Sequence, residues 1–164
     1  MKTHKHLRVD NRLLHGQVVQ FWIPHLGVQR LIIADDGVAS DPSLQIIYRM
    51  ALPEVVELIL IPVSCLMPEL EKQSVKETLV LVKDIESAKS NLKNCDQLKC
   101  ITLGNIHSSP ERDRVTDSVY LSGDEYKALA ELKRLGFLIE IETFPGDVLR
   151  LEVKNGGDTK WVKS

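Results

Sequence analysis

The chain has 164 residues, 43% of them hydrophobic and 27% charged, which suits one globular domain with a sizeable core. Its formal net charge of −2 argues against the basic surface that nucleic acid or an anionic membrane would require. The 3 cysteines form no CxxC pair, and their odd number favours free thiols over a disulfide framework or a zinc site.

The sequence predicts no membrane-spanning helix. The longest run without Asp, Glu, Lys, Arg or His, residues 58–68, contains two prolines and is shorter than the roughly 17–25 residues that cross a bilayer. Residues 1–10 lack the apolar core of a secretory signal peptide. We therefore expect a cytoplasmic protein that reaches a membrane only through a partner.

Short apolar runs alternate with helical patterns along the chain, an order typical of parallel βαβ units. The first strand, residues 6–10, is followed by a helix that begins near His15. Within that helix the ring of Pro24 would clash with the carbonyl of Gln20, so we expect the helix to kink or end near Ile23. Further strands are expected at residues 29–34, 55–61, 78–82 and 98–103, and further helices at 41–50, 68–73, 84–92 and 122–135.

Three of these helices begin at recognisable caps. Asp41, followed by Pro42, and Asp84 are both well suited to accept from the unpaired N–H groups of a first helical turn. Ser122 and Glu125 have the spacing of a capping box. These caps place the helix starts more firmly than periodicity alone.

The C-terminal third of the chain is less regular. Residues 105–114 read as a polar loop, and residues 115–121 as a short edge strand. Residues 137–143 alternate apolar and polar side chains, which indicates one solvated face and hence an edge position. Residues 154–164 are expected to form a loose tail.

Together these elements predict the α/β class. The domain, residues 1–153, is expected to be a single doubly wound, mostly parallel sheet with helices on both faces and an antiparallel edge strand. In such folds ligands bind at the carboxyl ends of the strands. The residues that this edge would gather are Asp10 to His15, Asp35, Asp36, Ser64, Asp84, Asn105 and His107.

His15 stands where the first strand passes into the first helix. A helix N-terminus presents unpaired N–H groups and the positive end of the helix dipole, which favours an anion, above all a phosphoryl group. Gly16 leaves room for such a group near the backbone, and Arg12 supplies a positive charge. A lone histidine on a helix is usually structural or merely exposed, and these two neighbours are what favour a functional interpretation.

Two interpretations stay open for each neighbour of His15. Arg12 either pairs with Asp10 at the surface or clamps the spread-out negative charge of a transferring phosphoryl group. Asp10 either ends the strand in a turn or orients Arg12 or the imidazole, and so fixes which ring nitrogen is free to attack. Gln17 is either a helix residue without a role in the site or a hydrogen-bond donor to phosphoryl oxygens.

Asp35 and Asp36 follow a buried strand, and paired carboxylates invite a magnesium interpretation. Without a third placed carboxylate, a turn and a helix N-terminus are the simpler role. His107, in the polar loop, is expected to be solvated and at most to reach the rim of the site. Neither GxGxxG nor GxxxxGK[ST] occurs, so the sequence predicts no nucleotide site of either kind.

The stretch RVDNRLLHGQVVQFW, residues 8–22, resembles the opening of the IIB subunits of the mannose/fructose/sorbose class of the bacterial phosphoenolpyruvate-dependent sugar phosphotransferase system. Their pattern is Arg-hydrophobic-Asp-Asp/Asn-Arg-hydrophobic-hydrophobic-His-Gly-Gln-Val. RLIIADDGVASDP (residues 30–42) is similar to the second strand and acidic turn of that family. SVYLSGDEYKALAELKRLGFLIEIETFPGD (residues 118–147) is similar to its closing helix, strand and proline turn.

The resemblance implies a phosphohistidine relay. A IIA protein or domain would pass its phosphoryl group to His15, and His15 would pass it to a sugar held in the membrane by IIC and IID subunits. Arg12 would stabilise the transferring charge and Asp10 would orient the imidazole, with no metal, nucleotide or other cofactor required. The residues expected to bind the phosphoryl group are Gly16, Gln17 and Asn11.

Two other functions remain as alternatives. The protein could carry phosphohistidine as a regulatory switch that another protein detects, without any coupling to transport. A metal-dependent phosphatase built on Asp35 and Asp36 is the third hypothesis, and its activity would survive His15→Ala.

Overall fold

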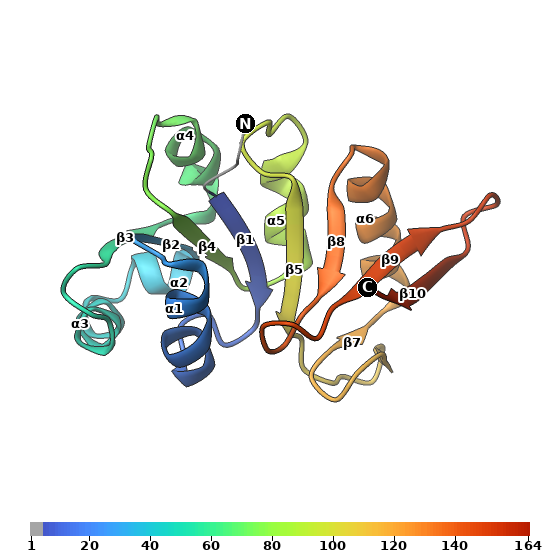
Figure 1. Ribbon diagram of the computed structural model, residues 1–164, viewed down its shortest axis with the longest axis horizontal. Helices are drawn as coiled ribbons and strands as arrows, with labels where there is room; N and C mark the ends of the chain where they lie inside the picture. The colour runs from blue at the N-terminus through green and yellow to red at the C-terminus, as the bar shows by residue number, and fades with distance from the viewer. Residues whose placement is uncertain (1–4) are drawn as a thin grey trace.

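Continuous apolar runs form the inner strands of the sheet. Every residue of β2 (Arg30–Ala34) and of β4 (Thr78–Val82) is buried, and β4 pairs in parallel with β1 (Lys5–Asp10). Burial on both faces is what an uninterrupted run such as TLVLV requires, because neither face can be left to water. In the computed structural model, which describes residues 5–164, these strands belong to one eight-stranded sheet (Figure 1).

The sheet confirms the predicted topology. Its strand order is β10-β9-β8-β5-β1-β4-β2-β3, in which the strands from β8 to β3 are parallel to one another, β9 is antiparallel to β8, and β10 is antiparallel to β9. The remaining strands are β3 (Glu57–Ile61), β5 (Cys100–Asn105), β8 (Leu138–Ile141), β9 (Leu149–Val153) and β10 (Thr159–Lys163).

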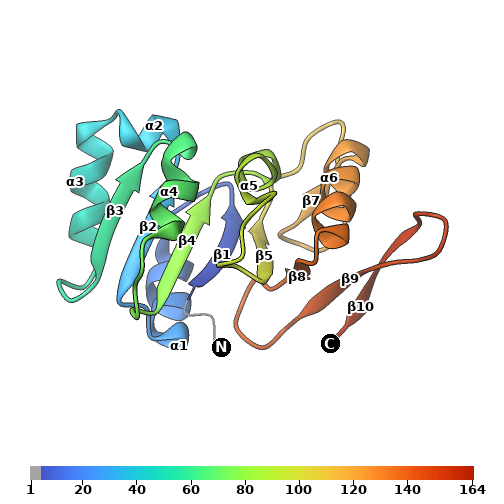
Figure 2. The same cartoon turned by 90° about the horizontal axis from the view of Figure 1, so that it is seen from above.

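Helices cover both faces of the sheet, and each face buries one hydrophobic cluster. Seen from above, α5 and α6 lie on one side of the sheet and α1 on the other (Figure 2). The cluster on the first side is built on α4 (Leu66–Glu71), α5 (Ile85–Leu92) and α6 (Gly123–Arg134). The opposite side carries a π-helical turn, η1 (Val18–Trp22), followed by α1 (Ile23–Leu26), α2 (Asp36–Ala39) and α3 (Pro42–Ala51). A short 3-10 turn, η2 (Val63–Cys65), precedes α4.

The predicted caps are confirmed. The Asp41 carboxylate accepts from two backbone N–H groups at the start of α3, and Asp84 accepts from Ser87 N–H at the start of α5. Ser122 and Glu125 form the reciprocal capping box of α6. The sequence located these helix starts because a cap is a local interaction that needs no tertiary partner.

The first helix does not end at Pro24. Residues 16–26 form one continuous helical run that passes through the π turn before it becomes α1 at Ile23. The N–H of Ile23 bonds to the carbonyl of Val18, five residues back. The wider turn accommodates a proline ring that would clash with an α-helical carbonyl and whose nitrogen has no hydrogen to donate. The helix therefore changes type near Ile23, and continues to Leu26.

Two expectations for strands near the C-terminus were wrong. Residues 137–143 contain β8, which lies inside the sheet between β5 and β9 and not at its edge. Of residues 115–121, predicted as one edge strand, only β7 (Tyr120–Leu121) is a strand, and it pairs with β6 (Asp113–Arg114) in a separate two-stranded ribbon. The alternation in β8 arises because one of its faces lies against α6 while the other carries the polar side chains.

The predicted loose tail was also wrong. Residues 159–163 form β10, which pairs antiparallel with β9 through a turn that contains Gly156 and Gly157, both with positive φ. The indole Nε1–H of Trp161 donates to the Tyr126 hydroxyl at 3.1 Å, which joins β10 to α6. A hairpin turn of this kind needs residues tolerant of positive φ, and the Asn-Gly-Gly sequence was the signal for it.

The structure adds one observation about membranes. Among residues 5–164, no helix combines the length and the apolar character needed to cross a bilayer. The expectation that residues 1–10 lack a signal-type segment lies partly outside the described residues.

Removal of the Trp161 side chain tests whether β10 contributes to the fold. We expect Trp161→Ala to lower the free energy of unfolding by about 2 kcal/mol, because a half-buried aromatic side chain and its hydrogen bond are lost. Urea unfolding measures the change. Lys160→Ala, on the same strand but in a surface ion pair with Glu152, should leave stability almost unchanged; equal effects of the two variants would show that β10 is not docked.

Candidate functional site

The candidate site lies in the loop between β1 and the first helix, at the carboxyl edge of the sheet. Asn11 N–H donates to the Asn105 carbonyl at 2.8 Å, which ties the loop to the end of β5. Leu13 adopts a left-handed backbone (φ 55°), unusual for a residue with a branched side chain. Its side chain is buried in the cluster beneath the helix. The loop is thus pinned at both ends, and His15 follows directly.

Asp10 is the centre of the site's hydrogen bonds. Its carboxylate is fully buried. Oδ1 accepts from the backbone N–H of Arg12 at 3.0 Å, and Oδ2 lies 2.8 Å from both His15 Nε2 and Asn105 Nδ2. The guanidinium of Arg8 approaches the same oxygen, with Nε at 3.5 Å.

The pKa of Asp10 reflects two opposed effects. Burial alone would raise it, but hydrogen bonds from His15 and Asn105, together with the charges of His15 and Arg8, hold the pKa below its usual value. Asp10 is therefore ionised near neutral pH, and an ionised carboxylate can only accept hydrogen bonds. It follows that His15 Nε2 carries a proton and donates it to Asp10.

This assignment leaves His15 Nδ1 unprotonated in the neutral imidazole, with a lone pair that can accept a hydrogen bond. Nδ1 accepts a long hydrogen bond from Gln17 N–H at 3.3 Å, at the start of the helical run. The His15 carbonyl accepts from Val19 N–H, so His15 caps the helix. The side chain is 12% exposed. The imidazole thus offers one protected nitrogen to the protein and one nucleophilic nitrogen to the helix mouth.

Gln17 contacts the imidazole through its backbone N–H, and Arg12 contacts the side chain of Gln17. Arg12 is exposed, and its Nη2 donates to Gln17 Oε1 at 3.2 Å. Asn105 Nδ2 contacts the same oxygen at 3.4 Å. Asp10 is buried, so the expected alternative of a surface Arg12–Asp10 pair does not describe this arrangement. A Cβ added at Gly16 would meet no protein atom, so the glycine leaves open space at the helix mouth.

The side chain of Asn11 is bound at both ends by the backbone of neighbouring loops. Its Nδ2 donates to the Lys83 carbonyl at 2.8 Å, and its Oδ1 accepts from His107 N–H at 2.7 Å. Asn11 therefore joins the loops that follow β4 and β5. These contacts support a role in positioning the loop of the site.

Arg8, for which no role was predicted, has the largest fully buried side chain among residues 5–164. Its Nη1 donates to the Glu142 carbonyl at 2.7 Å and its Nη2 to the Thr143 carbonyl at 3.4 Å. The guanidinium carbon lies 4.5 Å from the centre of the Trp22 ring, within the range of a cation–π contact. Burial lowers the pKa of Arg8, and the charge of Asp10 opposes that effect.

Two features of the sequence, the charge at Arg8 and the glycine at 104, are related to the buried position of Arg8. Arg8 is a charged residue inside an otherwise apolar strand, where it needs a buried partner. Gly104 comes directly before Asn105, and a Cβ there would lie 2.1 Å from Arg8 Nη2. Periodicity could not show that these positions meet, because the pairing of β1 with β5 is a tertiary contact.

Two hollows flank the site and share Asn105 in their walls. The first, about 620 Å³, opens next to Gln17, Thr143 and Phe144. The second, about 460 Å³, opens next to Arg12 and His107. The side chain of His107 is exposed at this rim, as predicted. The surface is thus hollowed next to Gln17 and next to Arg12, the two residues that contact each other near His15.

Asp35 and Asp36 act as caps away from this network. Asp35 Oδ1 accepts from Val38 N–H at 2.9 Å, at the start of α2, and Asp36 Oδ1 accepts from Val63 N–H at 2.9 Å. The predicted turn and helix N-terminus are confirmed. Among residues 5–164, no three His, Cys, Asp or Glu side chains are grouped as metal ligands.

Comparison with known proteins gives a consistent result. A family model described as the PTS system sorbose subfamily IIB component matches residues 4–153. The chain is 29% identical over 136 residues to a probable phosphotransferase enzyme IIB component from Streptococcus pyogenes, covering 79% of this chain and 83% of that protein. It is 25% identical over 142 residues to N-acetylgalactosamine-specific phosphotransferase enzyme IIB component 1 from Escherichia coli, covering 85% and 90%.

Solved structures agree with the fold. The crystal structure of manxB from Thermoanaerobacter tengcongensis superposes with a TM-score of 0.79 at 29% identity, covering 91% of this chain and 94% of that one. The IIBSor domain of the sorbose permease from Klebsiella pneumoniae shares the fold with a TM-score of 0.76 at 24% identity, covering 87% and 90%. The chain belongs to the sorbose subfamily of IIB components of the sugar phosphotransferase system, a family of phosphotransferases.

Acid pH should reduce the contribution of Asp10 to stability. Because its pKa is lower in the folded than in the unfolded chain, the contribution is complete above about pH 4 and is lost as the pH falls through the folded value. At pH 7 we expect Asp10→Asn to cost about 3–5 kcal/mol, since Arg8 is left buried without a counter-charge. Urea unfolding of the parent protein and of Asp10→Asn should show a smaller difference in the free energy of unfolding at pH 3 than at pH 7. A difference that does not change with pH would contradict the lowered pKa of Asp10. Asp117→Asn, at an exposed carboxylate, is the control.

Gly104→Ala tests the packing of Arg8. The new methyl group would displace the guanidinium from the carbonyls of Glu142 and Thr143, so we expect a loss of about 2–4 kcal/mol in the free energy of unfolding. At Gly123 a Cβ would meet nothing, so Gly123→Ala is the matched control. If both variants were as stable as the parent in urea, the close approach of Arg8 to position 104 would be wrong.

Proposed function

We propose that this protein is the phosphocarrier of a sugar transporter: His15 accepts a phosphoryl group from a IIA protein or domain and passes it to a sugar bound by membrane IIC and IID subunits. The observation that carries the proposal is the orientation of the imidazole. A buried, ionised carboxylate holds Nε2, and the unprotonated Nδ1, which accepts one long hydrogen bond from Gln17 N–H, lies at an open helix mouth.

In the first step, Nδ1 of His15 attacks the phosphorus of the donor's phosphohistidine. The new N–P bond forms as the N–P bond of the donor breaks, and the electron pair of that bond returns to the donor imidazole. Positive charge develops on the His15 ring, and Asp10 stabilises it through the Nε2–H bond. No proton needs to leave His15, because Nδ1 attacks with its lone pair.

The transferring group carries negative charge on three oxygens, and its stabilisation is chiefly electrostatic. Arg12 is exposed, contacts the side chain of Gln17 and would supply the positive charge. The N–H of Gln17 now touches Nδ1 at 3.3 Å, and can turn to a phosphoryl oxygen once Nδ1 is occupied. Gly16 leaves the space, and Asn11 holds the loop in place.

In the second step, a hydroxyl oxygen of the sugar attacks the same phosphorus. The O–P bond forms, the Nδ1–P bond breaks with its electron pair returning to Nδ1, and the hydroxyl proton passes to the medium. A mannose-specific EIIAB component from Escherichia coli is 20% identical over 142 residues, and this chain corresponds to 44% of it. That relative supports a IIA partner. The proposed location is cytoplasmic, at the inner face of the transporter.

Phosphotransfer from phosphoenolpyruvate through the general carrier proteins and a cognate IIA protein tests the relay. We expect acid-labile, alkali-stable label on the parent protein and none on His15→Ala. Arg12→Ala should slow labelling by roughly 10²–10³-fold, because transition-state charge stabilisation is lost, while its circular-dichroism spectrum stays unchanged. Label that persists on His15→Ala would overturn the proposal.

Transfer onward distinguishes transport from regulation. Labelled protein mixed with membranes that contain the matching IIC and IID subunits should lose its label when the transported sugar is added, with sugar phosphate as the product. A protein that accepts label but never releases it to a sugar would instead be a regulatory phosphohistidine protein.

A further inference from the structure

Two phenylalanines are exposed together near the site. Phe21 is 44% exposed and Phe144 is 47% exposed. Their ring centres are 5.5 Å apart, with an angle of 86° between the planes, an edge-to-face contact. Single exposed apolar residues are ordinary, but a contacting aromatic pair is the kind of feature that anchors protein interfaces.

The pair lies close to the nucleophile. Gln17, whose N–H contacts His15 Nδ1, is four residues before Phe21, roughly one turn earlier in the helical run. Phe144 and Gln17 line the same hollow. Phe144 therefore lines the hollow beside Gln17, and Phe21 contacts Phe144 from the next turn of the helix.

The pair is also held in a fixed position. The carbonyl of Thr143, next to Phe144, accepts from Trp22 Nε1 at 3.2 Å and from Arg8 Nη2 at 3.4 Å. Trp22 is the buried neighbour of Phe21. Both phenylalanines are thus attached to the same buried Arg8–Trp22 contact, so a partner would meet a preformed surface and lose little entropy in ordering it.

We propose that Phe21 and Phe144, which we call the aromatic rim, form the docking surface for the protein that delivers the phosphoryl group. The inference rests on the proposed function. Transfer between two histidines brings the donor into contact around His15, and a standard interface covers about 800 Å² per partner, a disc of roughly 16 Å radius. A disc centred on His15 includes the aromatic rim, and the exposed guanidinium of Arg12 faces the negative charge that the donor carries.

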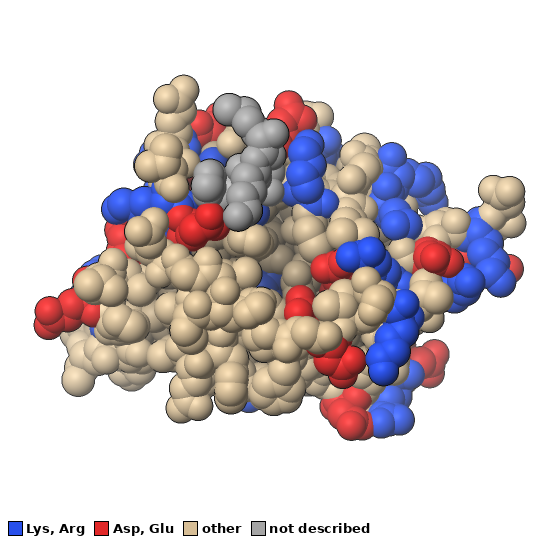
Figure 3. All heavy atoms as spheres, viewed as in Figure 1, with Lys and Arg blue, Asp and Glu red and all other residues tan. Residues whose placement is uncertain are grey.

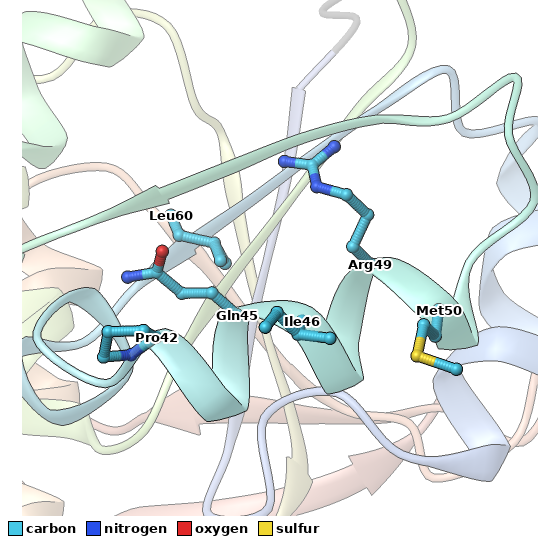
Figure 4. A pocket seen from close by; sticks show the side chains of 6 residues that line it. All are labelled: Pro42, Gln45, Ile46, Arg49, Met50 and Leu60. Carbon is cyan, nitrogen blue, oxygen red and sulfur yellow. The ribbon is translucent and has the colours of Figure 1, made fainter.

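A second exposed apolar surface provides a matched control. On α3, Ile46 and Met50 project outwards beside a groove that reaches Leu60 of β3 (Figure 4). Met50 is 81% exposed, more than either phenylalanine. In the strand order, however, β3 lies at the opposite end of the row β1-β4-β2-β3 from the strand that leads to His15. Uncharged side chains also dominate much of the face around α1 (Figure 3), so apolar character alone does not select the docking surface.

The test compares a protein donor with a small one. The cognate phosphorylated IIA protein must dock, whereas phosphoramidate can phosphorylate an imidazole without a protein interface. We expect Phe21→Ala and Phe144→Ala each to raise KM for the IIA donor about tenfold or more, with labelling by phosphoramidate within about twofold of the parent rate. Ile46→Ala and Met50→Ala should change neither reaction.

Each other outcome identifies a different failure. An unchanged KM in both phenylalanine variants, or a raised KM in the α3 variants alone, would overturn the docking surface while leaving His15 as acceptor. Slower labelling of the phenylalanine variants by both donors would show that the rim supports the site itself, which also overturns the inference. If the parent protein took no label on His15 from IIA, the proposed function would fail first.

Discussion

The site depends on one buried ion pair, Arg8 with Asp10. Removal of two charges from water is costly, and such a pair is tolerated only when the remaining polar atoms find partners. Here the guanidinium donates to two carbonyls beyond β8, and the carboxylate accepts from His15, Asn105 and the backbone of Arg12. The pair therefore links β1, β5 and the loop after β8 around a single carboxylate.

The Asp10 carboxylate fixes the orientation and the tautomer of the His15 ring. A histidine on an exposed helix start would exchange its proton between two nitrogens and rotate freely. Bound to Asp10, the ring has one orientation and one tautomer. The left-handed backbone of Leu13 belongs to the same arrangement, since an unfavourable conformation persists only where surrounding contacts maintain it, here the buried leucine side chain. The loop is thus ordered by packing of the buried Leu13 side chain, a contact that does not involve His15 Nδ1.

Local signals in the sequence predicted most of the fold and the main site residues. The apolar runs gave the parallel strands, and Asp41, Asp84 and Ser122 marked helix starts, because these features depend on near neighbours. His15, Arg12, Asp10 and Gln17 do gather, since they lie within one loop and one helical turn. What the sequence analysis missed depends on distant contacts: the burial of Arg8 against the residues that follow β8, the role of Asn105, and the interior position of β8. Pro24 indicated a disturbed helix near Ile23 but not that the turn before it would be a π turn, and the Asn-Gly-Gly signal for the hairpin to β10 was not recognised.

The contact between Arg8 and Gly104 also couples the evolution of β1 and β5. A side chain at position 104 and an arginine at position 8 cannot occupy the same space. A substitution at one position therefore requires a compensating change at the other. A relative with a larger residue at 104 would have to shorten or remove the residue at 8, and then find another counter-charge for the carboxylate two positions on. In an alignment of many such chains, positions 8 and 104 should vary together or not at all.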